Sequence, residues 1–219
     1  MKILILAPHP DDEVLGCGGT IAKNVGLGHE IYVVIITKAY TPNWSEQFLI
    51  NRQQEIKAVK TILGIKEYIF LDYPTVKVDT FPQKDLCDKL TDIVNTIKPE
   101  ILYIPHKGDL NKDHRLTFEA ALVAARPINH KIRRILSYEV LSETEWGNHI
   151  EPFFPTVYVD ISDTIELKIK AILAYKSELK EAPHPRSIVI IRSLAQKRGS
   201  EVGVNYAEAF TLLREISDS

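Results

Sequence analysis

The sequence predicts an α/β fold, a Rossmann-like three-layer α/β/α sandwich in which helices cover both faces of a mostly parallel sheet. The first observation is that short apolar runs alternate with segments of helical periodicity over most of the chain. The second is that Glu30–Ile36 is largely apolar and β-branched, as expected of a parallel strand buried on both faces. The third is that 219 residues with 45% hydrophobic content suffice for one domain with a sizeable core.

The elements of the first half follow from apolar runs and from residues that end helices. Gly28 and Gly64 follow helical segments, and Pro99 stops a third helix. We expect strands over Ile3–Ala7, Glu30–Ile36, Glu67–Leu71, Ile101–Pro105 and Ile135–Val140. Helices are expected between them, over Gly19–Leu27, Ser45–Leu63, Gln83–Ile97 and Asp113–Ala125. Because crossovers between parallel strands are right-handed, the ends of the first and fourth strands should share one rim of the sheet.

The pattern changes after Val140. We expect a strand over Pro155–Asp160, and helices over Thr164–Glu178, Ile188–Lys197 and Tyr206–Ile216. A proline-rich loop, Glu181–Pro185, separates the first two of these helices. There is no repeat, low-complexity tract or long linker, so residues 1–219 are expected to form a single domain.

Composition argues against several function classes. The net charge is −2, with 27 basic and 29 acidic residues well mixed, so nucleic acid is not an expected partner. Cys17 and Cys87 lie far apart and outside any CxxC pair, which indicates buried thiols in a reducing compartment. The glycine-rich run at residues 16–19 lacks the GxGxxG spacing of nicotinamide enzymes.

The sequence contains no sign of export or of a membrane span. Met1 and Lys2 precede a strand directly, without a hydrophobic leader and cleavage site. No apolar run approaches the roughly 20 residues that cross a bilayer. We therefore expect a cytoplasmic protein without a transmembrane segment, although its substrate could still be carried on a lipid.

The run His9-Pro10-Asp11-Asp12-Glu13 follows the first predicted strand. In open α/β sheets ligands bind at the carboxyl ends of the strands. One imidazole and three carboxylates crowded there repel one another or lose hydration unless something compensates them. A divalent metal is the simplest compensation, although the run could instead be an acidic helix N-terminus with an incidental histidine.

A second cluster of histidine and aspartate follows the fourth predicted strand. His114 falls in the first turn of the helix that begins at Asp113, so it can point back over the rim. Together with His9 and Asp12 it would make a two-histidine, one-carboxylate set with open positions. That composition suits a catalytic zinc with three protein ligands, and it is also found in non-haem iron sites.

The neighbours of His114 have structural alternatives. Asp113 could be a helix N-cap and could also orient His114. Asp109 and Asn111 could simply hold the loop by side-chain-to-backbone hydrogen bonds. We expect His106 to be a loop residue, because His114 completes the ligand set without it.

The two motifs, Ala7–Glu13 and Asp109–His114, together resemble those of the PIG-L/LmbE family of zinc-dependent N-deacetylases. The segment Arg52–Glu55 is similar to the family's Arg-x-x-Glu helix. The resemblance covers most of the chain, and later blocks give it weaker support: Ser137–Glu139, Thr144–Trp146, Pro183–Ser187, Arg198-Gly199 and Ala207–Phe210.

The resemblance implies an LmbE-like fold and a role for each matching residue. The zinc ligands would be His9, Asp12 and His114, and Asp11 would be the general base. Asp113 would be the carboxylate that partners a histidine, and Arg52 would bind substrate. The family's substrates are N-acetylated amino sugars, often in glycolipids, glycosides or nucleotide-linked sugars. The expected substrate is therefore a small or lipid-linked N-acetyl amino sugar.

Asn111 departs from the family pattern. Many members carry a histidine at this position, where it acts as an acid or stabilises the oxyanion. Asparagine can donate a hydrogen bond but cannot donate a proton. Either Asn111 stabilises the oxyanion while Asp11 shuttles the proton, or another group supplies the acid, for which His184 is the candidate.

Two other functions stay open at the level of sequence. One is another metal-dependent hydrolase, acting on a phosphoester or on a non-acetyl amide. A phosphoesterase would need a second metal, for which Glu13, Asp109 and His106 could serve. A sugar-binding protein with an inactive site is less expected, because all the required groups are present. Assembly into a homo-oligomer is plausible through the helices after Thr164.

Overall fold

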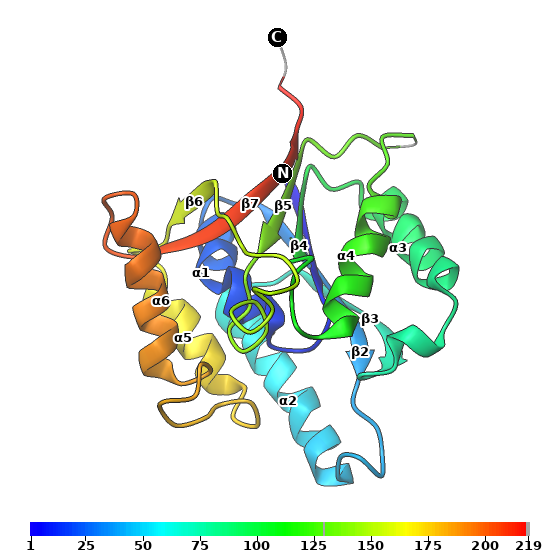
Figure 1. Cartoon of the computed structure of the whole chain (residues 1–219), viewed down its shortest axis with the longest axis horizontal. Helices are drawn as coiled ribbons and strands as arrows, with labels where there is room; N and C mark the ends of the chain where they lie inside the picture. Colours follow the sequence, from blue (N-terminus) through cyan, green and yellow to red (C-terminus); the bar gives the residue numbers. More distant parts are fainter. Residues whose placement is uncertain (129, 218–219) are drawn as a thin grey trace.

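The computed structural model describes residues 1–128 and 130–217, which form a three-layer α/β/α sandwich (Figure 1). The strands among these residues are β1 (Lys2–Ala7), β2 (Glu30–Lys38), β3 (Glu67–Pro74), β4 (Ile101–Pro105), β5 (Arg134–Tyr138), β6 (Val157–Asp160) and β7 (Ala207–Glu215). The helices are α1 (Asp12–Gly26), α2 (Glu46–Leu63), α3 (Gln83–Ile97), α4 (Lys112–Ala124), α5 (Ile165–Ala174) and α6 (Ile188–Ser200), with a short 3₁₀ turn η1 (Val78–Thr80).

The strands form one sheet in the order β3-β2-β1-β4-β5-β7-β6. The five strands from β1 to β5 pair in parallel, whereas β7 runs antiparallel to both β5 and β6. The sequence prediction of a mostly parallel, Rossmann-like sheet is therefore confirmed.

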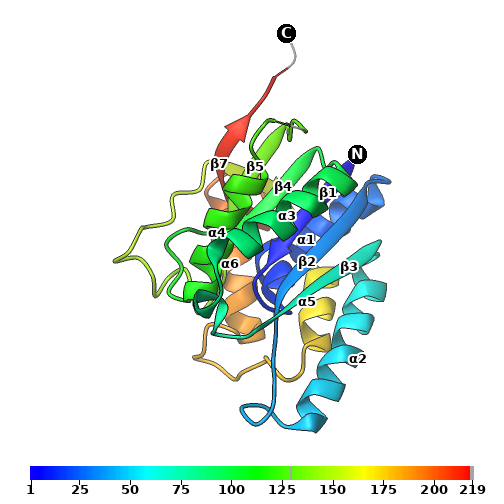
Figure 2. The same cartoon turned by 90° about the vertical axis from the view of Figure 1, so that its right-hand side faces the viewer.

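Two helical layers bury the two faces of the sheet. Helices α1, α2, α5 and α6 contribute to one apolar core, and α3 and α4 contribute to the other. Figure 2 shows α3 and α4 on one side of the sheet and α5 and α2 on the opposite side. Both cores contain alternating residues of β1, such as Ile5 in one and Leu6 in the other, as the period of a strand requires.

The carboxyl ends of β1 and β4 lie side by side at the centre of the sheet. Ile3 pairs with Ile101, and Ile5 pairs with Tyr103, in parallel register. On its other edge β1 pairs with β2, so the chain leaves β1 toward one side and returns to β4 on the other. Such a reversal of strand order opens a crevice at the strand ends, which is where ligands bind in α/β sheets.

The prediction of a helix over Tyr206–Ile216 is wrong, because Ala207–Glu215 is strand β7. This segment inserts between two strands, and Phe210 pairs with Tyr138 of β5 and with Val157 of β6. Pairing on both edges and the burial of its first four residues outweigh the helix-favouring composition of the segment.

Helix α1 begins at Asp12, seven residues before the predicted start at Gly19. The glycines of α1 allow neighbouring side chains to pack closely against the helix. A Cβ atom on Gly16 would lie 2.2 Å from Cδ2 of Tyr138, and one on Gly19 would lie 2.8 Å from Ile161. Cys17, between them, is a fully buried free thiol as expected, whereas Cys87, expected to be buried as well, is only partly buried. The helix expected over Thr164–Glu178 is shorter in the structure, where α5 ends at Ala174.

Among the described residues, none of the helices combines the length and the apolar character that crossing a bilayer requires.

Candidate metal centre and active site

The turn between β1 and α1 delivers the first motif. The backbone N–H of His9 donates to Oδ2 of Asp12 at 2.8 Å, which closes the turn and places both side chains on the same side. Asp11 has a φ of 128°, in a region that favours glycine, and its N–H donates to Oε2 of Glu13 at 3.0 Å. Glu13 is fully buried and also accepts hydrogen bonds from the hydroxyls of Tyr68 and Tyr175. Strained backbone of this kind persists only where the surroundings hold it, as at functional sites.

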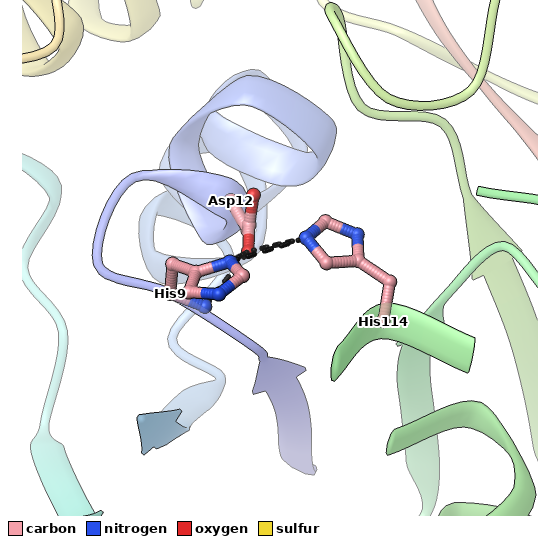
Figure 3. A group of neighbouring side chains, drawn as sticks. All are labelled: His9, Asp12 and His114. Carbon is pink, nitrogen blue, oxygen red and sulfur yellow. Dashed lines mark hydrogen bonds and ion pairs between the residues drawn. The ribbon is translucent and has the colours of Figure 1, made fainter. Parts of the chain in front are cut away.

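Three donor atoms from the two motifs converge in Figure 3. Nδ1 of His9 lies 3.2 Å from Nε2 of His114, and Oδ2 of Asp12 lies 3.3 Å from each of these two nitrogens. Among residues 1–128 and 130–217, His9, Asp12 and His114 are the one group of histidine, cysteine and carboxylate side chains close enough to hold a metal ion.

The outer nitrogen of each histidine is bound to a carboxylate. Nε2 of His9 donates to Oδ2 of Asp113 at 3.2 Å, and Nδ1 of His114 donates to Oδ2 of Asp109 at 2.8 Å. Because an ionised carboxylate can only accept, each imidazole carries its proton on that outer side. In the neutral rings the inner nitrogens keep a lone pair directed at the same point, an arrangement that fixes metal-binding histidines; in the protonated rings they donate to Oδ2 of Asp12.

The two carboxylates are fixed in turn by other loops. Asp113 accepts the backbone N–H groups of Val76 at 2.7 Å and Val78 at 3.2 Å, after β3. Asp109 accepts the hydroxyl of Thr144 at 2.6 Å, in the segment after β5. Four strand ends thus contribute to the position of the two histidines.

The structure corrects the expected roles of these carboxylates. The N-cap of α4 is Asn111, whose side chain accepts from the N–H of Asp113 at 3.0 Å, so Asp113 is not the cap. Asp113 orients His9 and not His114, whereas the loop residue Asp109 orients His114. Asp109 was missed because its spacing of five residues from His114 has no periodic signature. The one indication in the sequence was that Asp109 follows the same strand, β4, as His114 does.

Burial and charge shift the pKa values of the three donors. Burial lowers the pKa of His9, but hydrogen bonds to Asp113 and Asp12 outweigh it and raise the pKa to about 9. For Asp12, burial favours the neutral form, but the charges and hydrogen bonds of His114 and His9 prevail and hold its pKa far below the usual range. The site thus stabilises a positive charge between these side chains, whether protons or a metal ion supply it.

Asp11 lies beside this centre at the edge of a cavity. Burial, together with the negative charges of Asp12 and Glu178, raises the pKa of Asp11 well above its usual value. Arg186 opposes this shift, since its Nη1 lies 3.3 Å from Oδ2 of Asp11. A carboxylate with a raised pKa is suited to accept a proton from water near neutral pH.

Arg52 is built into the same network. Its Nη1 donates to the carbonyl of Pro10 at 2.6 Å, and its Nη2 is paired with Glu178. Glu178 also accepts from Nη1 of Arg186 at 2.7 Å. Glu178 and Arg186 belong to the segment between α5 and α6. Arg186 lies in the block Pro183–Ser187 that resembles the family, but the sequence alone indicates no role for either residue.

The cavity has a volume of about 480 Å³, which is within the range of pockets that hold drug-sized ligands. His9, Asp11, Asp12 and Asn111 line one part of it. The lining also includes Arg52, Arg186, Glu143, Glu178 and a group of apolar side chains from α2, β2 and β3.

His184 lies outside the lining of this cavity. Its Nδ1 accepts the N–H of Arg186 at 3.1 Å, and its ring lies 6.2 Å from that of Trp146. Burial and the positive charges of Arg186 and Lys180 lower the pKa of His184.

The residues considered for a second metal are engaged elsewhere. Nε2 of His106 contacts the carbonyl of Glu151 at 2.9 Å, as expected of a loop residue. Glu13 is occupied by Tyr68 and Tyr175, and Asp109 by Thr144 and His114. Across the part of the chain that the structure describes, these three do not form a second group of metal donors.

Comparison with known proteins places this geometry in a family. Residues 4–125 match the family model of PIG-L, GlcNAc-PI de-N-acetylase. Diacetylchitobiose deacetylase of Thermococcus kodakarensis is 26% identical, over 98% of this chain and 84% of the relative. The uncharacterised deacetylase YaiS of Escherichia coli is 30% identical, over 80% of this chain and 90% of the relative.

A solved structure gives the same result. N,N'-diacetylchitobiose deacetylase of Pyrococcus horikoshii superposes with a TM-score of 0.79 and 26% identity, covering 97% of this chain and 83% of that chain. The family model covers more than half of the chain, and a relative that is 30% identical covers most of it. The chain therefore belongs to the PIG-L (LmbE-like) family of de-N-acetylases.

Proposed function

We propose that this protein is a zinc-dependent deacetylase that hydrolyses the acetamide of an N-acetylated amino sugar. The observation that carries the proposal is the triangle of His9 Nδ1, Asp12 Oδ2 and His114 Nε2, with the carboxylate of Asp11 beside it in a cavity. The names of the relatives support the substrate class, since they include deacetylases of diacetylchitobiose, of a glucosaminyl inositol and of a glucosaminyl malate.

The donor triangle fits zinc. Ligands 2.0–2.2 Å from a tetrahedral ion lie about 3.4 Å apart, close to the 3.2–3.3 Å separations of these three atoms. Three protein ligands leave one position open, which is the arrangement of catalytic sites. Iron(II) accepts the same ligands, so the donor set favours zinc without excluding iron. When bound there, the ion would polarise the acetyl carbonyl and make a water molecule acidic near neutral pH.

Asp11 is the proposed general base. Its carboxylate takes a proton from the attacking water as the oxygen forms a bond to the carbonyl carbon. The same proton then passes to the amide nitrogen as the carbon–nitrogen bond breaks. The products are acetate and a free amine, so one carboxyl group serves first as base and then as acid.

Asn111 is the proposed donor to the oxyanion. Its Oδ1 accepts from the N–H of Asp113, so the helix cap uses the amide oxygen and does not use the Nδ2 donor. Asn111 lines the cavity, whereas His184 does not. These contacts support the assignment in which Asn111 stabilises developing negative charge while Asp11 carries the proton.

Arg52 is proposed to position the bound sugar and the backbone next to Asp11. It lines the cavity and can meet a bound sugar, and it also holds Pro10, next to Asp11. Both roles are consistent with the substrate-binding assignment that the family resemblance implies.

The proposal is tested by acetate release from a panel that contains free N-acetylglucosamine, diacetylchitobiose, and inositol-, malate- and UDP-linked N-acetylglucosamine. We expect release from at least one of them by the wild-type chain and none above background by His114→Ala. Equal release by His114→Ala, or hydrolysis only of phosphoesters, would reject the proposed function.

A further inference from the structure

The cavity continues beyond the metal centre along an apolar wall. We define this wall by the five apolar side chains larger than alanine that line the cavity on α2, on the segment before it and on β3 without being fully buried: Trp44, Phe48, Leu49, Ile50 and Phe70. The N-terminal half of α2 extends beyond the sheet (Figure 2). Three of the five wall residues lie on α2 and a fourth, Trp44, lies just before it.

The wall leads away from the metal centre. Arg52 is tied to Pro10 next to the catalytic carboxylate, and Phe48 lies one helical turn further out. The ring of Phe48 is 5.0 Å from Cζ of Arg52, and the ring of Trp44 is 6.5 Å from that of Phe48. A sugar whose acetamide is at the metal centre would therefore direct a substituent toward Phe48 and Trp44.

The wall is more exposed than a structural role requires. Ile50 is 53% exposed and Phe70 is 42% exposed, while Phe48, Leu49 and Trp44 are only partly buried. Single exposed apolar side chains are ordinary, but a contiguous group that lines a cavity marks a binding surface.

The charges in the cavity argue against an anionic substituent. Apart from His9 of the metal centre, the cations among the described lining residues are Lys38, Arg52 and Arg186, and each faces a carboxylate. The lining also carries five carboxylates, which are Asp11, Asp12, Asp72, Glu143 and Glu178. A phosphate or a second carboxylate on the substrate would meet no surplus of positive charge beyond that of a bound metal ion.

We infer that the apolar wall binds an uncharged alkyl or aryl substituent at the far end of the amino sugar. The inference rests on the proposed deacetylase function and narrows its substrate class to neutral glycosides with an apolar group. Phosphate-linked, nucleotide-linked and malate-linked amino sugars are correspondingly disfavoured.

The test compares kcat/KM for free N-acetylglucosamine, its hexyl β-glycoside and its 1-phosphate. We expect the hexyl glycoside to exceed the free sugar by roughly tenfold or more, as one apolar group in a hydrophobic pocket provides. In the double variant Trp44→Ser/Phe48→Ser this ratio should fall toward one. The control Phe154→Ser removes an aromatic ring that is 69% exposed and outside the cavity lining, and it should keep the ratio.

The inference is overturned if the wild-type chain does not prefer the hexyl glycoside, if it prefers the 1-phosphate, or if the preference survives in the double variant. A binding titration separates this failure from failure of the proposed function. The titration follows tryptophan fluorescence and gives the Kd of the hexyl glycoside. A Kd at least tenfold higher in Phe48→Ser than in wild type would support binding at the wall, even if no acetate were released. Equal Kd values in wild type and Phe48→Ser would reject binding at the wall.

Discussion

At the scale of single residues, the centre is defined by two histidines that use opposite ring nitrogens. His9 presents Nδ1 and His114 presents Nε2, because Asp113 and Asp109 hold the other nitrogen of each ring. The two sequence motifs predicted the three metal donors, because the motifs follow the ends of two neighbouring strands. The pairing of each ring with its carboxylate could not be predicted, since it depends on loop geometry.

The role of Asp11 is tested by Asp11→Asn. The amide keeps the size of the side chain but cannot take a proton, so we expect kcat to fall by about 10²–10⁴-fold. Zinc content, measured by atomic absorption, should stay at the wild-type level because Asp11 is not one of the three donors. Full activity in this variant would remove Asp11 from the mechanism.

The role of Asp109 is tested by Asp109→Ala. Loss of the carboxylate frees Nδ1 of His114 and the hydroxyl of Thr144, so the inner nitrogen is no longer held in place. We expect zinc affinity to fall by about 10–100-fold, measured by competition with a chelator. Glu151→Ala is a suitable comparison, because this exposed carboxylate pairs with Lys107 away from the centre. Unchanged affinity in Asp109→Ala would contradict the orienting role.

Asn111→Asp separates capping from catalysis. The carboxylate keeps the acceptor that caps α4 but removes the N–H donor. We expect kcat to fall by about 10²–10³-fold, with the unfolding midpoint close to that of wild type. His184→Ala should have a much smaller effect on kcat, since this ring lies outside the cavity lining. A larger loss in His184→Ala than in Asn111→Asp would reverse the assignment.

At the scale of elements, β7 connects the sheet to the helices behind the site. Glu208 of β7 accepts the backbone N–H groups of Gly19 and Thr20 in α1 and a hydrogen bond from Nζ of Lys168 in α5. Nζ of Lys168 also donates to the carbonyl of Leu15 at 2.7 Å. This buried, fully bonded pair joins three elements that are far apart in sequence. Single-segment periodicity contains no information about such partners, so the sequence suggested a helix where β7 lies.

The structural value of this pair is measured by chemical denaturation of Lys168→Met. Removal of the ammonium leaves the buried carboxylate of Glu208 without its cation, and both side chains are almost inaccessible. We expect a loss of about 3–5 kcal/mol in the free energy of unfolding. In Lys168→Met/Glu208→Leu the loss should be smaller than in either single variant. A loss below about 1 kcal/mol in Lys168→Met would show that the pair adds little.

At the scale of the whole molecule, the sheet order accounts for the position of the site. Because β1 lies between β2 and β4, the two motifs meet where the strand order reverses. The meeting of the two motifs could be predicted from the sequence, because the apolar strands give strong local signals and crossovers between parallel strands are right-handed. The wall of α2 and the segment with Glu178 and Arg186 depend on how distant elements pack across that rim, which no local pattern records.

The central claim is that His9, Asp12 and His114 hold one catalytic zinc ion. The most direct measurement is acetate release by chelator-stripped protein during titration with zinc, on the best substrate of the panel. We expect no activity in the stripped protein and a rise that saturates at one equivalent per chain. Activity that persists without metal, or that requires two equivalents, would contradict the claim.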